Sequence, residues 1–283
     1  MKSKNKKQKR AGPFICWSED EDKLIKKLYK NKSCTEILKH FPQRTWHSLR
    51  NRVKFLNLKR RGYKLNDLSS LNNESVESFY WIGLLIADGH FTEKRISLGL
   101  HKKDINHLEK FKKFVQSQNK IQLYKSNMCV FAPCDKINVQ KIIKRFKISS
   151  NKTHNPINLS WFLDKKPEFF LSFICGFIDG DGTVFKRKNR KESYTISIVG
   201  YKTWIKNFHI INDFLYNYFK ENKRKIGVKL VKRFSRCPND PIKRKNTIAT
   251  IAISNSNLIK NFTKKIKELK IPAMERKWGK VSI

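Results

Sequence analysis

The chain is poor in acidic residues and has no long apolar segment. Only 23 of its 283 residues are Asp or Glu, against 63 Lys and Arg, which gives a formal net charge of +40. No apolar run approaches the roughly 18 residues of a membrane span, so we expect no membrane partner. Cysteine is scarce as well. The six cysteines form no CxxC pair, which favours free thiols in a reducing, intracellular compartment over disulfides or a zinc site.

The excess of basic residues indicates a polyanionic partner. Self-repulsion at a net charge of +40 destabilises a compact state unless a polyanion neutralises it. Nucleic acid is the obvious candidate, and binding that releases counterions weakens steeply with salt. Hydrophobic residues still make up 39% of the chain, which is enough for a packed core. The composition therefore predicts an ordered protein that binds nucleic acid.

Residues 14–61 are predicted to form a small trihelical domain that follows a basic, disordered arm at 1–13. A capping box, in which Ser is followed three residues later by Glu, begins the first helix at Ser18 and the second at Ser33. Thr45 caps the third helix. A polar linker is expected over 62–75.

The third of these helices has an apolar stripe on one side and a basic face on the other, as a helix that enters the major groove of DNA has. Trp17, the acidic run 19–22 and the pair Arg44-Thr45 make the domain resemble Myb/SANT-like helix-turn-helix domains. The resemblance implies that this unit binds DNA or, less often, protein. The candidate DNA-binding residues on the basic face are Arg50, Arg52 and Lys54.

Two segments further along the chain match each other. Each of them, Trp81–Gly89 and Ile174–Gly182, is predicted to form an apolar helix that ends at an Asp-Gly pair. The two aspartates, Asp88 and Asp181, lie 93 positions apart. A single apolar helix that ends in Asp-Gly is most simply a helix with a glycine stop. Two copies that open the same order of elements favour a functional pair instead.

Each half is predicted to contain a helix, two strands, a helix, two strands and a helix, with the first repeat at 76–163 and the second at 164–283. The fold class is therefore α+β, with two pseudo-twofold αββαββα repeats. An antiparallel sheet can pack one face against helices and leave the other open, so two such sheets would form a basic, DNA-binding saddle. Its candidate DNA-binding residues are Arg95, Lys186, Arg187, Lys188, Lys229 and Arg233.

Glycines in the two helices predict a close helix pair. Gly83 and Gly176 occupy matching positions, and helices that meet at glycine can approach closely. Such a pair brings Asp88 and Asp181 together, and two adjacent carboxylates ionise at low cost only when cations bridge them. Mg²⁺ suits a site with few carboxylates plus waters and phosphate oxygens. This combination predicts metal-dependent hydrolysis of phosphodiester bonds.

The paired segments resemble the double signature of single-chain LAGLIDADG homing endonucleases, and the resemblance covers residues 76–283. It implies Mg²⁺-dependent cleavage of both strands of double-stranded DNA by a monomer, with two or three metal ions shared between the two acids. The final acids of the signatures, Asp88 and Asp181, are implied to be catalytic metal ligands, assisted by the carbonyls of Ala87 and Gly180.

The resemblance also implies a basic residue near each metal site. Asn151-Lys152-Thr153 is similar to the Lys-Thr/Ser segment of the family, and Arg276-Lys277-Trp278 to its Arg-Lys-aromatic ending. Lys152 and Lys277 are therefore candidates to order water or stabilise charge.

The first signature departs from the family pattern at three positions. Ile86 stands where an acid is frequent, whereas the second signature keeps Asp179. Trp81 and Ile82 are bulky where Leu and Ala are usual, which predicts looser or altered helix packing. Two alternatives remain open: an RNA maturase that binds intron RNA and assists splicing, and a DNA-binding regulator that does not cleave.

Overall fold

A computed structural model describes residues 16–29, 32, 34–58, 66–187, 193–222, 227–234 and 245–282, without the side chains of 233, 234, 245 and 246. The chain divides into two compact units, Met1–Leu65 and Asn66–Ile283. Each unit is described by itself.

The described part of the first unit contains three helices, α1 (Glu19–Leu28), α2 (Cys34–Leu38) and α3 (Trp46–Phe55). The capping box predicted at Ser18 is confirmed, with Ser18 and Glu21 each accepting the other's backbone N–H. Thr45 caps α3 as predicted, through the N–H of Ser48. The box predicted at Ser33 lies outside the described residues. The three helices enclose a small core of Ile25, Ile37, Phe41, Leu49 and Val53.

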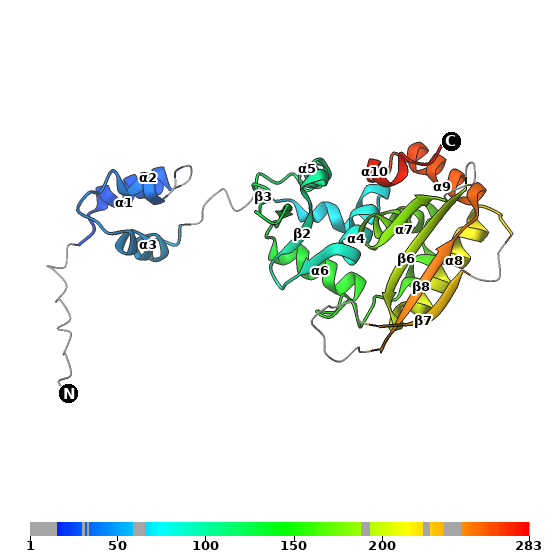
Figure 1. Ribbon diagram of the computed structural model, residues 1–283. Coiled ribbons are helices and arrows are strands. Elements are labelled where there is room, and N and C mark those ends of the chain that lie inside the picture. The colour runs from blue at the N-terminus through cyan, green and yellow to red at the C-terminus, as the bar shows by residue number, and fades with distance from the viewer. Residues whose placement is uncertain are drawn as a thin grey trace, which may run out of the picture. The chain divides into compact units, whose positions relative to one another are not determined.

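The second unit repeats one order of elements twice (Figure 1). The first half contains α4 (Val76–Asp88), β1 (Gly89–Phe91), β2 (Ile96–His101), α5 (Ile105–Phe114), β3 (Gln122–Leu123), β4 (Met128–Phe131) and α6 (Lys136–Phe146). The second contains α7 (Pro167–Asp181), β5 (Gly182–Lys186), β6 (Tyr194–Tyr201), α8 (Ile205–Tyr218), β7 (Val228–Phe234), β8 (Lys245–Ile253) and α9 (Ser256–Glu268), followed by the short α10 (Glu275–Trp278). Short 3-10 helices lie at Leu68–Asn72, Lys102–Asp104, Leu159–Asp164 and Lys202–Trp204.

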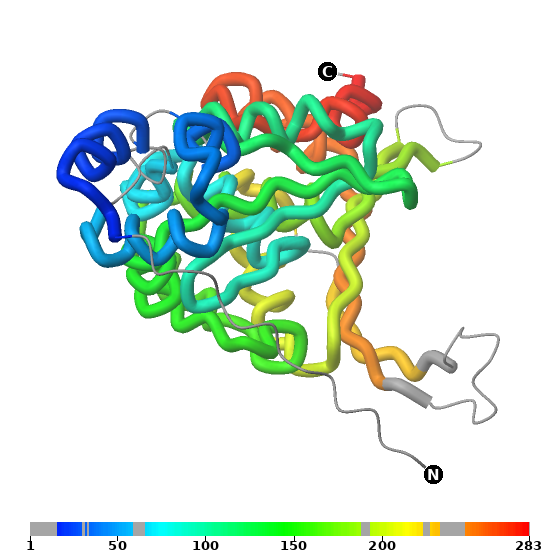
Figure 2. Tube along the Cα trace, turned by 90° about the vertical axis from the view of Figure 1, so that its left-hand side faces the viewer, coloured from blue at the N-terminus to red at the C-terminus, as the bar shows by residue number. Residues whose placement is uncertain are grey.

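The two sheets have the same topology. Their antiparallel strand orders are β1-β2-β4-β3 and β5-β6-β8-β7, which gives two αββαββα repeats and confirms the predicted fold class. The strands form because apolar residues alternate along them: on β2, Ile96, Leu98 and Leu100 are buried while the residues between them are partly exposed. Figure 2 shows the first sheet in front, with the strands of the second running beside it.

Within the segment predicted as a linker, the 3-10 helix Leu68–Asn72 belongs to the second unit. Its Leu68 and Leu71 have no exposed surface and join the main hydrophobic core. The described cysteines are free thiols, and Cys237 lies outside the described residues. Among the helices that the structure describes, none combines the length and the apolar character needed to cross a membrane.

Helices α4 and α7 pack against each other at the centre of this unit (Figure 1). A Cβ added at Gly83 would lie 2.0 Å from the carbonyl oxygen of Phe173, and one added at Gly176 would lie 2.0 Å from that of Tyr80. Each contact joins a glycine to the residue three positions before the other glycine, so the two contacts are related by a pseudo-twofold axis. Only glycine fits at either position.

Trp81 and Ile82 predicted looser or altered packing of the helix pair, and the first of these alternatives is wrong. Both side chains are fully buried, while the helices meet at the backbone contacts of the two glycines. Trp81 packs instead on α5, where its ring centroid lies 4.9 Å from that of Phe111. The bulky residue therefore fills the core of its own repeat and leaves the helix interface unobstructed.

Candidate active site

The two aspartates of the paired segments lie together at the C-terminal ends of α4 and α7. Each is the last residue of its helix, which the following glycine ends by taking an extended conformation. A Cβ added at Gly180 would lie 3.4 Å from the Cγ of Asp88 and 2.3 Å from the Cβ of Ala87. The helix ends therefore touch where the chain places one glycine and one alanine, and Asp88 and Asp181 share this junction.

Both aspartates have exposed surface, but the surrounding protein partly removes their carboxylates from water. Partial desolvation raises the pKa of Asp181 to about 6, and repulsion from Asp88 contributes. Desolvation also raises the pKa of Asp88, against the attraction of Lys277 and Lys152. The pair is thus a concentration of negative charge that a cation would stabilise.

The two candidate lysines meet the same helix ends. Lys152 donates from Nζ to the carbonyl oxygens of Ile86 and Ala87, both at 2.6 Å. Lys277 is buried and reaches four carbonyl oxygens of the second signature, those of Ile178 (2.9 Å), Asp179 (2.5 Å), Gly180 (3.4 Å) and Gly182 (2.7 Å). Burial lowers the pKa of both lysines, and the neighbouring aspartates oppose that shift.

Asp179 does not belong to this exposed pair, because its carboxylate is buried and both of its oxygens accept hydrogen bonds from the protein. Its Oδ2 accepts from the Tyr80 hydroxyl (2.7 Å) and from the Met274 N–H (2.8 Å), and its Oδ1 accepts from Trp278 Nε1 (2.9 Å). Burial raises the pKa of Asp179 to about 6, and these donors oppose the shift.

The donor set suits a hard cation that keeps most of its own water. Among the described residues, no cluster of three or more His, Cys, Asp or Glu side chains is placed to hold a metal. Two carboxylates and nearby backbone carbonyls are few protein ligands, as is usual for Mg²⁺ when phosphate oxygens and waters complete its shell. The Ala87 carbonyl already accepts from Lys152, so its predicted role as a metal ligand would require sharing or displacing that lysine. The Gly180 carbonyl is held only loosely, at 3.4 Å from Lys277.

The predicted DNA-binding residues of the second unit have differing environments. Arg95, Lys186 and Lys229 are exposed. Arg187 is engaged with neighbouring strands, donating from Nε to Thr195 Oγ1 (3.0 Å) and from its Nη2 to Ser254 Oγ (2.5 Å). Lys188 and the side chain of Arg233 lie outside the described residues.

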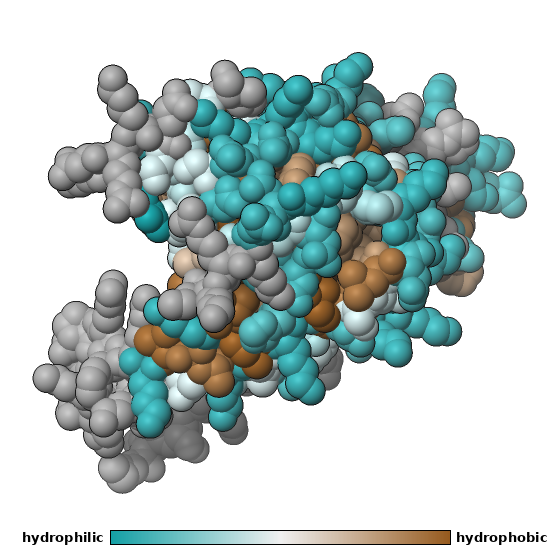
Figure 3. Space-filling model, turned by 90° about the vertical axis from the view of Figure 1, so that its right-hand side faces the viewer, coloured by the Kyte–Doolittle hydropathy of each residue, from teal (hydrophilic) through white to brown (hydrophobic). Residues whose placement is uncertain are grey.

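The sheet surfaces also carry exposed apolar side chains. Figure 3 shows a face of the molecule that is largely hydrophilic and is broken by separate hydrophobic patches. The exposed large apolar residues on the second sheet are Phe185, Val199 and Leu230, which are 41%, 39% and 52% exposed. These sheets therefore present apolar contacts as well as charge, and sequence reasoning that counted only basic residues overlooked them.

In the first unit, the predicted DNA-binding residues of α3 divide in the same way. Arg50 and Lys54 are exposed, and the guanidinium of Arg50 lies 5.3 Å from the ring centroid of Trp46. Arg52 forms a bidentate ion pair with Asp22, at 2.7 and 2.6 Å. A contact between Arg52 and DNA remains a prediction, and Arg52 would have to make that contact while it binds α1.

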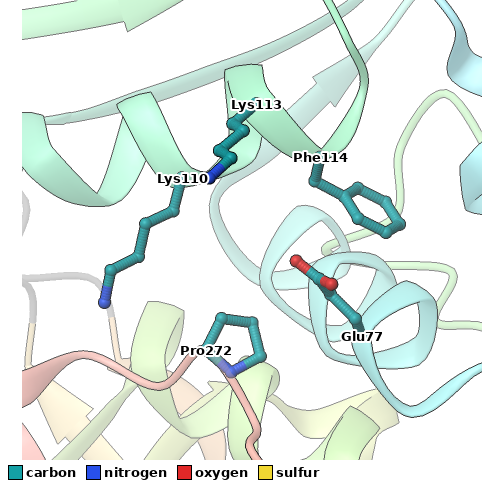
Figure 4. A pocket seen from close by; sticks show the side chains of 5 residues that line it. All are labelled: Glu77, Lys110, Lys113, Phe114 and Pro272. Carbon is teal, nitrogen blue, oxygen red and sulfur yellow. The ribbon is translucent and has the colours of Figure 1, made fainter.

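A hollow of about 420 Å³ lies near the opposite end of α4 from Asp88 (Figure 4). Its lining residues are Glu77, Lys110, Lys113, Phe114 and Pro272. The Glu77 carboxylate already accepts from Trp81 Nε1 at 3.3 Å. The hollow thus has mixed charge and one apolar wall and contains no pair of groups arranged for catalysis.

Several residues that support the site were not identified from the sequence. Tyr80 and His107 are bonded to each other within the core, with Oη and Nε2 2.7 Å apart. Trp204 donates from Nε1 to the Thr153 carbonyl at 3.2 Å, beside Lys152, and Asp104 binds Arg276 at 2.7 Å, beside Lys277. Their positions in the repeats could have identified two of them. Asp104 and Trp204 each end the 3-10 turn that follows the second strand of a repeat.

Comparisons with known proteins gave matches among solved structures only. No protein-family profile matches the chain, and no curated protein matches it either. The LAGLIDADG meganuclease I-CpaMI, bound to uncleaved DNA, is 13% identical over 70% of this chain and 86% of its own, with a TM-score of 0.42. The meganuclease I-SmaMI, bound to DNA with a TTGT central four, is 14% identical over 74% and 87%, with a TM-score of 0.44. The LAGLIDADG homing endonuclease I-LtrWI, bound to target DNA, is 13% identical over 74% and 86%, with a TM-score of 0.41.

Proposed function

We propose that the protein is a site-specific, metal-dependent endonuclease that cleaves both strands of double-stranded DNA. The observation that carries the proposal is the junction of α4 and α7, where Asp88 and Asp181 share one site between two lysines. Carboxylates in that arrangement hold divalent metal in enzymes that hydrolyse phosphodiesters. The net charge of +40 supplies the attraction for a polyanionic substrate.

In this proposal, Asp88 and Asp181 would hold Mg²⁺ ions, which supply Lewis-acid activation of water and stabilisation of the leaving oxygen. The lysines act beside them. Lys152 and Lys277 each brace one helix end through its carbonyls, and each places a positive charge near developing negative charge on the phosphate. The pseudo-twofold relation of the halves suits a substrate whose two strands are also related by a twofold axis.

The two antiparallel sheets are the proposed DNA-binding surface. Arg95, Lys186 and Lys229 are exposed on or beside the strands and are suited to phosphate contacts, which position the duplex without reading its sequence. Phe185 and Val199 lie on the face of the second sheet opposite the buried Ile196 and Ile251. They are suited to contact base edges such as the thymine methyl group.

The first unit is proposed to add an auxiliary DNA contact through α3. Replacing both Arg50 and Lys54 by Ala in the full chain is expected to weaken DNA binding and to reduce the slope of log affinity against log salt by about 2, because each phosphate contact contributes about 0.9. Lys26→Ala, which alters an exposed lysine of α1, is the control. An unchanged slope in the Arg50/Lys54 variant would contradict a DNA-binding role for α3.

The proposed activity can be tested without knowing the target. The purified full chain is incubated with a randomised duplex DNA library in Mg²⁺ or in EDTA, and the cleaved ends are sequenced. The proposal predicts cleaved molecules that share one long site, cut in both strands, only when Mg²⁺ is present. Recovery of no cleaved DNA across a range of salt concentrations would contradict it, and tight binding of RNA without cleavage would favour the maturase alternative.

A further inference from the structure

The Asp179 carboxylate lies fully within the protein, yet it accepts hydrogen bonds from three separate donors. They are the Tyr80 hydroxyl, the Met274 N–H and the Trp278 indole N–H, all within 2.9 Å. A buried carboxylate is costly unless its oxygens are satisfied. Three donors on one carboxylate therefore indicate a fixed arrangement that depends on the acid.

Two of these donors lie on either side of Lys277 in the chain. Asp179 binds the backbone of Met274 and the side chain of Trp278, so it holds the short α10 segment at both ends. Lys277 lies within that segment and extends its ammonium to the carbonyls at the end of α7. A displacement of the segment would therefore move Lys277 away from the helix end.

The third donor is itself oriented by a neighbouring histidine. His107 Nε2 lies 2.7 Å from the Tyr80 hydroxyl oxygen, and burial lowers the pKa of His107 to about 4, so the ring is neutral at pH 7. The Tyr80 hydroxyl donates its hydrogen bond to Asp179. The neutral His107 ring therefore carries its N–H on Nε2 and donates a hydrogen bond to the Tyr80 oxygen. The chain of bonds runs from α5 through α4 to Asp179.

Within the first repeat, residues 76–163, all of which the structure describes, there is no equivalent of this network. The positions that match Tyr80 and Asp179 hold Phe173 and Ile86, and both are buried. The segment that carries Lys152 is held differently, by the indole N–H of Trp204 on the Thr153 carbonyl. The two lysines thus have the same place at the helix ends but different supports.

We propose that Asp179 is a positioning residue that fixes Lys277 at the site by binding the residues on both sides of it. Asp179 does not contact the reacting atoms; it acts through the α10 segment. The inference rests on the proposed function for the role of Lys277 in cleavage, whereas the placement of Lys277 can be tested by itself.

The placement is tested by the reactivity of lysine side chains in the full chain. Asp179→Asn keeps the shape of the residue but replaces one of its two acceptor oxygens by an NH2 group. The double variant Tyr80→Phe/Asp179→Ile introduces the residue types found at the matching positions, Phe173 and Ile86. Modification by an amine-reactive reagent is followed by mass spectrometry, with Lys152 as the internal reference. The ratio of Lys277 to Lys152 modification is expected to rise about tenfold, as follows from losing one buried hydrogen bond to a charged group.

The control is Asp104→Asn, which weakens another contact of this segment, the ion pair between Asp104 and Arg276. The Arg276 side chain is 55% exposed and that of Asp104 is 9% exposed. The pair joins the segment through Arg276 alone, so the ratio should rise less than in the Asp179 variants. An unchanged ratio in both Asp179 variants would overturn the proposal. An equal rise in the Asp104 variant would do so as well, because any loss of contact would then release Lys277.

Cleavage gives a second readout that separates positioning from general stability. On a duplex labelled on each strand, the Asp179 variants are expected to cut one strand at least about tenfold more slowly than the other and to accumulate nicked DNA. Equal slowing of both strands would contradict the positioning role. If the wild-type chain cleaves no DNA, the proposed function fails, but the reactivity ratio still decides whether Asp179 places Lys277.

Discussion

The two halves of the second unit are alike where their helices meet and differ in how they support their lysines. At the helix pair, Gly83 and Gly176 make reciprocal contacts with the backbone of the opposite helix. Beyond it, the first half places Lys152 against two carbonyls, whereas the second buries Lys277 against four. The comparison indicates that both halves need the same close glycine contact between the helices. The hydrogen bonds that hold the two lysines can differ between the halves.

Removal of either lysine's charge is expected to have the largest effect on DNA cleavage. Lys152→Met and Lys277→Met should each slow single-turnover DNA cleavage by about 10²–10³, the usual cost of removing one preorganised donor. Lys277→Met should also lower the melting temperature more than Lys152→Met, because it leaves more buried carbonyls unpaired. Lys141→Met, in the exposed part of α6, controls for loss of charge. Cleavage unchanged in either variant would remove that lysine from the site.

Substitution of the two helix glycines tests whether both sides of the α4–α7 contact exclude a side chain equally. Gly83→Ala and Gly176→Ala should each destabilise the fold by about 3 kcal/mol or prevent folding, because the new Cβ would meet a carbonyl oxygen that cannot move aside. Gly99→Ala, whose Cβ would make ordinary contacts with the Val130 and Met128 side chains at 3.5 and 3.6 Å, should change stability by less than about 0.5 kcal/mol. Chemical denaturation measures all three. A tolerated alanine at only one of the two helix positions would break the pseudo-twofold relation.

Exchanging the glycine and the alanine beside the aspartates tests how closely the two helix ends pack. Gly180→Ala alone should destabilise the protein by about 2 kcal/mol, because its Cβ would lie 2.3 Å from that of Ala87. Adding Ala87→Gly removes the clash and should restore stability to within about 1 kcal/mol of the wild type. Failure of the second substitution to rescue the first would show that the helix ends differ in more than the position of one methyl group.

The smallest effect concerns the charge of Asp181. Its raised pKa, about 6, means that the folded protein binds this proton more tightly than the unfolded chain, so ionisation destabilises the fold as pH rises through 6. Without metal at pH 7.5, Asp181→Asn should therefore raise the melting temperature by about 2–4 °C, which corresponds to about 1 kcal/mol after allowance for solvent exposure. The gain should disappear between pH 6 and pH 4. A gain that is constant with pH would contradict the electrostatic cause.

Local patterns predicted the architecture well. The strand alternation, the cap at Thr45 and the match between Trp81–Gly89 and Ile174–Gly182 depend on near neighbours in the chain, so the sequence contains them directly. The pairing of the two segments predicted that Asp88 and Asp181 meet, because glycine spacing and helix ends are also local properties.

Contacts between distant residues were not predictable in this way. Nothing near Asp179 in the chain indicates that Tyr80, Met274 and Trp278 converge on it, since these residues lie more than 90 positions away. Trp81 was misread for the same reason: its partner Phe111 lies on another helix. The direction in which a buried side chain points depends on tertiary packing.

The most direct test of the account compares Asp88→Asn, Asp181→Asn and the double variant on a supercoiled plasmid that carries the selected site. If the two aspartates form one shared centre, each single variant loses double-strand cleavage and keeps its affinity for DNA, and the double variant is no slower than either single one. Losses that multiply in the double variant, or undiminished cleavage in either single variant, would contradict a shared centre.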